Sequence, residues 1–363
     1  MLHRSIARRA LDDPSAAPRR AEHTAPRALR LVAGGDIIFG RYIHGTLQFA
    51  GGPEPFVHLA PLFRAADLAV VNLETPITDA DPPSKRSHAG WLTFRAPPER
   101  TADLVDAGLD LLITANNHAE DCGPAGIADT RRHLDAAGLA HVGTHPDGDP
   151  FAPVTLDIGG LRVAVLAATS KRNRGRPRPG ERVPVAYLTL DDTLAQLPDR
   201  VRAVRARGEH DLVIVSLHWG AGGERHVHGK QIAIARALID AGADLILGHH
   251  AHILQAVERY GDGFVVYGMG NLVFDMHERE GRETALFDLT LAPRGARWRV
   301  ERLVVHPFIY DTPKTPTRPA TAEEAGIILA PVARDSRLRF DTHLVREGDT
   351  LVWTRDPEPV AGP

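Results

Sequence analysis

Six short apolar runs in this sequence each end in polar residues that can do chemistry. The run LRLVAGGD ends at Asp36, while DLAVVNLE and DLLITANNH end at Glu74 and His118. DLVIVSLHWG leads to His218, DLILGHHAH to a group of three histidines, and FVVYGMGN to Asn271. Apolar runs of this length are typical of buried strands. The carboxyl ends of parallel strands share one edge of a sheet, so we expect these polar side chains to converge on one site.

Helical patterns separate several of these runs. PAGIADTRRHLDAAG has a proline near its start and a glycine at its end, and KQIAIARALIDAG also closes on a glycine. Strands that alternate with helices predict an α/β fold. We expect residues 28–363 to form a single domain, because no linker is long enough to separate a second one. From about residue 310 the sequence predicts a Pro/Thr-rich loop, a helix and a terminal hairpin that turns at residues 347–349.

Composition excludes several classes of function. Lys+Arg 43 against Asp+Glu 46 gives a net charge of -3, so no global field recruits nucleic acid or membrane. The single cysteine, Cys122, cannot form an intramolecular disulfide, which fits a reducing compartment. No apolar run approaches the roughly 18 residues of a membrane span, and the Arg/Ala/Pro-rich segment 1–27 lacks the apolar region of a secretory signal. We therefore expect a disordered tail over residues 1–27, no membrane anchor and a cytoplasmic location, while the oligomeric state stays unknown.

The polar residues at the strand ends form a ligand set for divalent metal ions. Oxygen and imidazole donors suit Mn, Fe, Zn or Mg rather than metals that prefer sulfur. Two ions about 3.5–4 Å apart need one bridging carboxylate, which Glu74 can supply. The other expected ligands are Asp36, Asn117, His218, His250 and His252. In an extended His-x-His segment both side chains point to one side, which predicts that His250 and His252 face the ions and that His249 points away.

Each motif also has an ordinary structural explanation. Asp36 after Gly-Gly is typical of a turn or a helix cap, and Glu74 can be a solvated strand end. The two amides and the imidazole of Asn116, Asn117 and His118 are costly to bury without partners, although a satisfied loop network is the default for any one of them. The motifs occur together, each at a strand end, and this joint occurrence favours a functional site.

Seven motifs follow one another along the chain: GDIIFGR, NLETPI, FRAPPE, ANNHAEDCG, HWG, GHHAH and YGMGNLVFD. In this order they closely resemble the CapA family of poly-γ-glutamate capsule biosynthesis proteins, over about residues 30–290. That family is a branch of the calcineurin-like metallophosphoesterase superfamily. The resemblance implies an αββα fold, a two-sheet β-sandwich flanked by helices, with metal bound at the strand ends. It also implies a metal-dependent enzyme that acts on a polyglutamate-like or peptide substrate in a biosynthetic pathway.

The resemblance also implies roles for individual residues. The positions that match metal ligands are Asp36, Glu74, Asn117, His218, His250 and His252, with Glu74 as the bridge. His118 matches the general acid beside the scissile bond. Arg41 and Glu224 match positions that contact substrate or support the ligands, and we expect the same of Asn116 and Asn271.

One departure from the family pattern affects the metal site. Phosphoesterases of this fold carry Asp-x-His in the first motif, but here Asp36 is followed by Ile37 and Ile38. One metal position therefore lacks an imidazole, so we expect one or two ions, bound more weakly at that position. The missing imidazole argues against simple phosphoester hydrolysis.

Two alternative functions stay open. In the first, the protein is a peptide epimerase, because some CapA-like relatives invert an amino-acid centre in a peptide. Asp36 and His252 would then remove and return the Cα proton from opposite faces. In the second, the protein is a non-catalytic subunit that binds a carboxylate chain. The basic segment 170–180 is expected to be a solvated loop or to attract an anionic substrate such as an acidic peptide.

Overall fold

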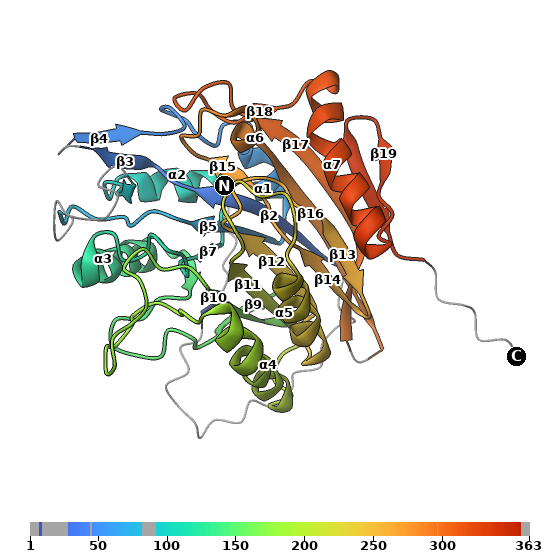
Figure 1. Cartoon of the computed structure of the whole chain (residues 1–363), viewed down its shortest axis with the longest axis horizontal. Coiled ribbons are helices and arrows are strands. Elements are labelled where there is room, and N and C mark those ends of the chain that lie inside the picture. The colour runs from blue at the N-terminus through green and yellow to red at the C-terminus, as the bar shows by residue number, and fades with distance from the viewer. Residues whose placement is uncertain (1–6, 9–27, 44–45, 82–91, 296, 357–363) are drawn as a thin grey trace, which may run out of the picture.

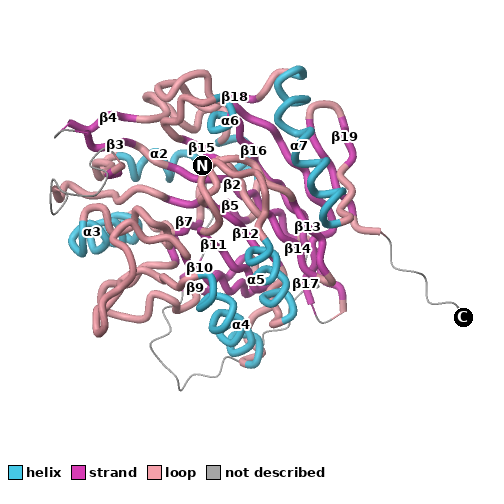
Figure 2. Tube along the Cα trace, in the orientation of Figure 1, coloured by secondary structure: helices cyan, strands magenta, loops and turns pink. Residues whose placement is uncertain are grey.

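The computed structural model describes residues 7–8, 28–43, 46–81, 92–295 and 297–356. Two β-sheets lie face to face and helices flank them (Figure 1). Figure 2 shows the same arrangement, with strands through the centre and helices around them. The expected α/β sandwich of the αββα type is therefore confirmed.

The larger sheet carries the first half of the predicted strand ends. Its strands are β2 (Leu29–Ile37), β5 (Leu68–Leu73), β7 (Leu111–Ile113), β8 (Ala140–Val142), β15 (Asn271–Val273), β16 (Glu283–Arg294), β17 (Arg297–Ile309), β18 (Arg318–Pro319), β19 (Val345–Glu347) and β20 (Thr350–Thr354). The order is β19-β20-β17-β16-β2-β5-β7-β8, with β15 beside β2 and β18 beside β17. β2, β5, β7 and β8 run parallel, so their carboxyl ends share one edge.

The smaller sheet carries the histidine-rich strand ends. Its strands are β1 (Ala7–Arg8), β9 (Val154–Ile158), β10 (Leu161–Thr169), β11 (Leu212–His218), β12 (Leu245–His249), β13 (Val257–Tyr260) and β14 (Gly263–Val266). The order is β1-β9-β10-β11-β12-β14-β13, with β10, β11, β12 and β14 parallel. A third sheet contains β3 (Gly40–Ile43), β4 (Thr46–Phe49) and β6 (Thr93–Phe94).

The expected disordered tail over residues 1–27 lies outside the described residues except for Ala7–Arg8. These two residues pair with β9 in an antiparallel bridge, and the expectation for the rest of the tail stays a prediction. Strand pairing satisfies the backbone groups of a segment that composition alone marks as polar.

Strands buried on both faces build one core between the sheets and one on each outer side. Val70 of β5 and Ile214 of β11 belong to the core between the sheets, whereas Val71 packs outward against the helices. The helices beside the larger sheet are α1 (Ala60–Ala65), α2 (Arg100–Ala107) and α3 (Gly123–Ala136), and those beside the smaller sheet are α4 (Leu190–Ala206) and α5 (Gly229–Asp240). The predicted helices over α3 and α5 are confirmed. Alternate side chains reach opposite faces because the strand period is two.

The C-terminal part follows the order that the sequence predicts. After the short α6 (Arg279–Arg282), the chain passes through β16 and β17 to a loop and then to α7 (Ala322–Phe340). A capping box between Thr321 and Glu324 starts α7, and the hairpin of β19 and β20 follows it. No helix in the described part of the chain combines the length and the apolar character that crossing a bilayer requires.

The run FVVYGMGN does not form one strand as expected. β14 ends at Val266, and the chain then crosses to the larger sheet, where Asn271 starts β15 opposite Asp36 of β2. The expectation that Asn271 ends a strand is therefore wrong. The glycines of this run allow the crossing, because Gly270 adopts φ +70.

Two glycines allow backbone segments to approach closely beside the polar strand ends. A Cβ atom at Gly35 would lie 2.0 Å from the carbonyl oxygen of Gly270, and one at Gly248 would lie 2.0 Å from the carbonyl oxygen of Tyr267. These glycines immediately precede Asp36 and His249. The close approach therefore brings β2 and β12 into the positions from which their terminal side chains meet.

We expect Gly248→Ala to destabilise the protein by about 3 kcal/mol, because the added methyl group forces β12 away from the backbone of Tyr267. Urea unfolding followed by circular dichroism measures the change. Gly326→Ala is the matched control: it lies in α7 with no atom within 4 Å of an added Cβ, so it should be neutral or slightly stabilising. Equal stability of Gly248→Ala and the wild type would contradict the close-approach argument.

Candidate metal centre

The predicted ligands come from both sheets and meet between them. The larger sheet supplies the acidic and amide side chains, and the smaller sheet supplies the histidines. The residues brought together are Asp36, Glu74, Asn117, His218, His250 and His252. Asp36, Glu74 and His218 are buried, and the other three are half-buried. The strand ends that converge therefore come from two sheets, whereas the sequence predicts that they share one edge of a single sheet.

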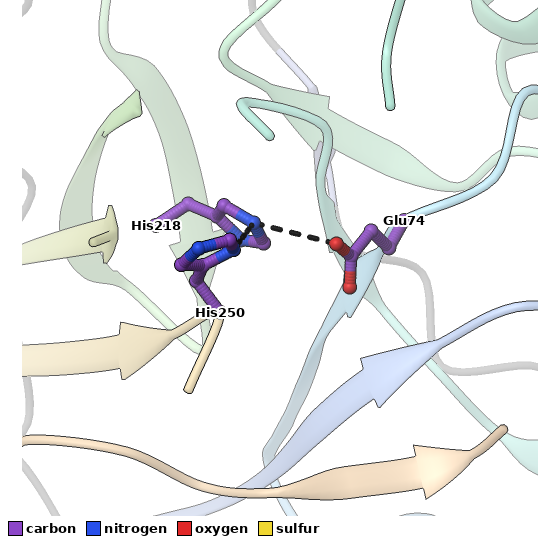
Figure 3. Close-up of side chains that lie close together, drawn as sticks. All are labelled: Glu74, His218 and His250. Carbon is purple, nitrogen blue, oxygen red and sulfur yellow. Dashed lines mark hydrogen bonds and ion pairs between the residues drawn. The ribbon is translucent and has the colours of Figure 1, made fainter. Parts of the chain in front are cut away.

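Glu74 is common to two groups of ligand atoms. In the first group, atoms of Glu74, His218 and His250 lie within 4.8 Å of one another, and in the second the same holds for Asp36, Glu74 and His252. Figure 3 shows the carboxylate of Glu74 facing the imidazoles of His218 and His250. A carboxylate shared in this way has the position that a bridging ligand requires.

Asn117 joins the first group through its side-chain oxygen. His218 Nε2 lies 2.7 Å from Asn117 Oδ1, 3.1 Å from His250 Nδ1 and 3.4 Å from Glu74 Oε1. Amide oxygen, carboxylate oxygen and neutral imidazole nitrogen all carry lone pairs. At such distances the four donor atoms are better suited to binding one shared divalent cation than to hydrogen bonding with one another.

Glu74 itself gives the clearest sign that a cation fits here. Its side chain is fully buried, and neither carboxylate oxygen accepts a hydrogen bond from any described residue. Burial, together with the nearby carboxylate of Asp36, raises the pKa of Glu74 to about 8. A buried carboxylate without donors costs several kcal/mol unless it is neutralised or coordinates a metal. The residues present therefore fit the divalent ions that the strand-end chemistry implies.

Asp36 lies in the same site, but both of its carboxylate oxygens have hydrogen-bond partners. Its Oδ1 accepts from Asn72 Nδ2 and contacts His249 Nδ1, both at 2.9 Å, and its Oδ2 accepts from the backbone N–H of His250 at 3.1 Å. Burial alone would raise the pKa of Asp36, but the hydrogen bond and charge of His249 hold it well below its usual range. The prediction that His249 points away is therefore wrong, because this histidine orients Asp36.

The backbone after β12 is not extended, contrary to expectation. His250 and His252 adopt φ of 84 and 58, in the left-handed region that few residues other than glycine occupy. The chain turns at each of them, so that His250 joins the group with His218 whereas His252 joins the group with Asp36. Left-handed backbone at non-glycine residues is typical of functional sites, where the surroundings hold the strain.

The imidazoles of the first group are held neutral. Burial lowers the pKa of His218 and of His250 well below the ordinary value, and for His250 the neighbouring histidines lower it further. Only the neutral form of an imidazole has a lone pair for a metal. Both side chains are therefore ready to coordinate at neutral pH.

His118 is held apart from the ligand groups by Asp121. His118 Nδ1 lies 2.6 Å from Asp121 Oδ2, and its ring stacks on Phe94 with centroids 3.8 Å apart. Burial alone would lower the pKa of His118, but the charges of Asp121 and Glu74 raise it above the ordinary value. An imidazole that is oriented by a carboxylate and retains its proton suits a general acid.

The four residues expected to contact substrate or support ligands take different positions. Arg41 pairs with Asp275 and lies over the ring of Phe94, while Asn116 donates to the Leu73 carbonyl oxygen and to Asn72. Asn271 Oδ1 lies 2.9 Å from His252 Nδ1, which orients that imidazole. Glu224 contacts His228 at the half-exposed surface, so its side chain is not brought into the ligand groups.

The position of the missing imidazole is filled by apolar packing. Ile38 is fully buried and clusters with Phe94, Phe274 and Tyr310. His252 lies against this cluster, with its ring centroid 4.9 Å from that of Phe274. The second ligand group therefore has three donor residues and an apolar wall.

Sequence reasoning missed several contributors to the site. Asp121 is three residues after His118 on the same turn, and this spacing was the available signal. Asn72 is expected from the run DLAVVNLE as a polar strand-end residue, but the sequence assigns it no role. Asn173 lies within the basic segment and contacts both Asn117 and His118, which no local pattern indicates.

The basic segment 170–180 is not uniformly a free positive surface. The side chain of Arg172 is almost fully buried, and its guanidinium binds the carboxylates of Glu120 and Glu181. Arg174 and Arg176 are exposed. One arginine of the segment is therefore structural, while others face solvent.

Comparisons with known proteins agree with the motif order. A family model described as "Bacterial capsule synthesis protein PGA_cap" matches residues 30–276. The Capsule biosynthesis protein CapA of Bacillus anthracis is 30% identical over 278 residues, which are 76% of this chain and 66% of that protein. The PGA biosynthesis protein CapA of Bacillus subtilis (strain 168) is 29% identical over 283 residues, or 75% of this chain and 70% of that protein. The chain thus spans about two thirds of the length of these relatives.

A solved structure is also similar to this chain. It is the calcineurin-like phosphoesterase YfkN from Bacillus subtilis, with a TM-score of 0.43 and 15% sequence identity. The match covers 75% of this chain and 88% of that chain.

The ionisation of Glu74 should control the stability of the metal-free protein. An unfolded glutamate loses its proton near pH 4.5, whereas the folded site holds the proton of Glu74 to about pH 8. The contribution of protonated Glu74 to the stability of the fold is thus fully present below about pH 4.5, and it is lost as the pH rises through 8. Relative to Glu74→Gln, the wild type should lose on the order of 3 kcal/mol between about pH 5 and pH 9 in a chelator.

Urea unfolding at each pH measures this difference, with Glu224→Gln as the control because that half-exposed carboxylate lies outside the ligand groups. Parallel pH curves for the wild type and Glu74→Gln would show that the carboxylate is not desolvated in the fold.

Proposed function

Because this chain belongs to the PGA_cap family of bacterial capsule synthesis proteins, which includes CapA, we propose that it is a metal-dependent enzyme that acts on a polyglutamate-like or other peptide substrate in a biosynthetic pathway. The observation that carries the proposal is Glu74, a fully buried carboxylate that two groups of ligand atoms share and that has no hydrogen-bond donor in the part of the chain that the structure describes. The names of the relatives refer to capsule and PGA biosynthesis, which supports an acidic polymer as the class of substrate.

The two ligand groups would hold the metal ions. The first group consists of Glu74, Asn117, His218 and His250, and the second consists of Asp36, Glu74 and His252. Divalent Mn, Fe or Zn suits these oxygen and nitrogen donors. Bound there, such ions supply Lewis-acid polarisation of a substrate oxygen.

The protein's own residues would position the substrate and move the proton. The Nδ1–H of His118 would donate a hydrogen bond to Asp121 Oδ2, which lies at 2.6 Å, and this leaves Nε2 to donate a proton to a leaving group. The ring of Phe94 stacks on His118 and excludes water from one face of it. The exposed arginines of segment 170–180 add positive charge that favours an acidic chain.

A peptide epimerase is the second candidate, favoured by the unequal ligand groups. Ile38 leaves the second group with one donor residue fewer than the first. The second group would therefore hold a metal ion less firmly, which leaves Asp36 and His252 available for proton transfer. Asp36 is held as the carboxylate, the form that accepts a proton, and the imidazole of His252 is partly exposed. In this mechanism one of the two residues removes a Cα proton and the other returns a proton to the opposite face.

We expect protein purified without chelator to carry up to two divalent ions, and elemental analysis measures them. Glu74→Gln should lose both ions, with affinity lower by at least about 100-fold, because both groups share its carboxylate. His250→Ala should lose one ion, and Glu224→Gln should keep both. Absence of Mn, Fe and Zn from the wild type, with no effect of added metal on Tm, would contradict the metal proposal.

The reaction can be identified by incubating the protein with γ-linked and α-linked glutamate oligomers in deuterated water, followed by mass spectrometry. We expect a change in chain length without deuterium at Cα. His118→Asn should lower turnover by roughly 10²–10⁴-fold with the metal content unchanged.

Two other outcomes would favour the alternative functions. A single deuterium at one Cα without a change in length would establish the epimerase. Tight binding of the oligomer with neither change, preserved in His118→Asn, would establish a binding subunit.

A further inference from the structure

A second segment of the chain reaches the candidate metal centre at Asn117. Residues 170–175, here called the Asn173 loop, follow β10 and are tied to the neighbouring strand end by the backbone N–H of Ser170, which donates to the His218 carbonyl oxygen at 2.9 Å. A turn closes the loop, with Gly175 at φ +75 and its N–H donating to the carbonyl oxygen of Arg172. The loop thereby places Asn173 over the turn that carries Asn117 and His118.

Asn173 decides which end of the Asn117 amide faces the ligands. An amide side chain has one end that donates and one that accepts. Asn117 Nδ2 donates to Asn173 Oδ1 at 2.9 Å, so Asn117 Oδ1 is turned toward His218 Nε2 at 2.7 Å. Without this acceptor, the amide of Asn117 is free to rotate and present its NH₂ group, which cannot coordinate a cation.

A buried ion pair holds the Asn173 loop in place. The side chain of Arg172 is only 4% exposed, and its Nε and Nη2 donate to the two oxygens of Glu120 at 2.5 and 3.0 Å. Glu181 accepts a further hydrogen bond from the same guanidinium at 2.5 Å. Glu120 lies two residues after His118, so the anchor joins the loop directly to the turn that carries the site. Bidentate pairs of this kind fix geometry as well as energy.

We propose that Asn173 is a positioning residue of the metal centre: it fixes Asn117 with its oxygen toward the ion, and the ion pair of Arg172 with Glu120 holds Asn173 there. This inference rests on the proposed metal binding. It assigns to the basic segment a role in building the site, distinct from attraction of substrate by its exposed charges.

Calorimetric titration of the metal-free protein with Mn²⁺ tests the proposal. Asn173→Ala should weaken one of the binding steps by about 10- to 100-fold, as the loss of a hydrogen bond to a metal ligand does. Because Asn173 acts through Asn117, adding Asn173→Ala to Asn117→Ala should cause no further loss. Gln196→Ala removes an exposed amide on α4 and should bind like the wild type.

The outcomes of this titration distinguish failure of the positioning role from failure of the proposed function. Wild-type affinity in Asn173→Ala, or additive losses in the double variant, would overturn the positioning role and leave the proposed function standing. A wild type that binds no Mn²⁺, Zn²⁺ or Fe²⁺ would overturn the proposed function and this inference with it.

The anchor can be tested without metal. In Glu120→Gln the bond between Arg172 and Asn173 should be cut faster by trypsin than in the wild type, because the neutral amide no longer holds the guanidinium. Mass spectrometry of the fragments measures the rate, and circular dichroism confirms that the variant is folded. Equal cleavage rates would show that this ion pair does not hold the loop, and would overturn that part of the proposal.

Discussion

Two carboxylates are buried side by side in this site, and they determine how the rest of it is built. Hydrogen-bond partners stabilise the charge of one carboxylate but not that of the other. Asp36 has the imidazole of His249, the amide of Asn72 and a backbone N–H as partners, so its charge is stable in the interior. Glu74 is equally buried but has no hydrogen-bond donor among the described residues. Like charges at low dielectric repel strongly, so the second carboxylate needs a proton or a cation. The neutral imidazoles of His218 and His250, and the Asn117 oxygen beside His218, would supply the further ligands that a cation requires.

Holding these groups together requires backbone that is strained or closely packed. Gly35 and Gly248 allow approaches that a Cβ atom would prevent, and His250 and His252 occupy the left-handed region. Each of these two histidines costs about 1–3 kcal/mol and persists only when its surroundings determine its conformation. Here the surroundings are the parallel pairing of β11 with β12 and the hydrogen bond from the His250 backbone to Asp36. The stability of the two-sheet core therefore offsets the strain of the site.

The two ligand groups differ in their number of donor residues. The first group has four donor residues, whereas the second has three and faces the apolar cluster around Ile38 and Phe274. His252 belongs to the second group and its side chain is 18% exposed, so a substrate can approach from that side. His118 and Asp121 form a separate hydrogen-bonded pair.

The sequence by itself determined the fold class, which polar side chains meet at the strand ends, and the helices of α3, α5 and α7, because apolar periodicity and helix caps are local signals. It also identified Glu74 as the shared carboxylate, since motif order along the chain carries that information. It failed for the orientation of His249, for the backbone at His250 and His252, and for Asn271, which starts a strand in the other sheet. It gave no sign of Asn173 at the site. Only the tertiary structure decided these points, because each depends on how two sheets meet: contacts between residues far apart in the chain override local preference, and no local pattern records them.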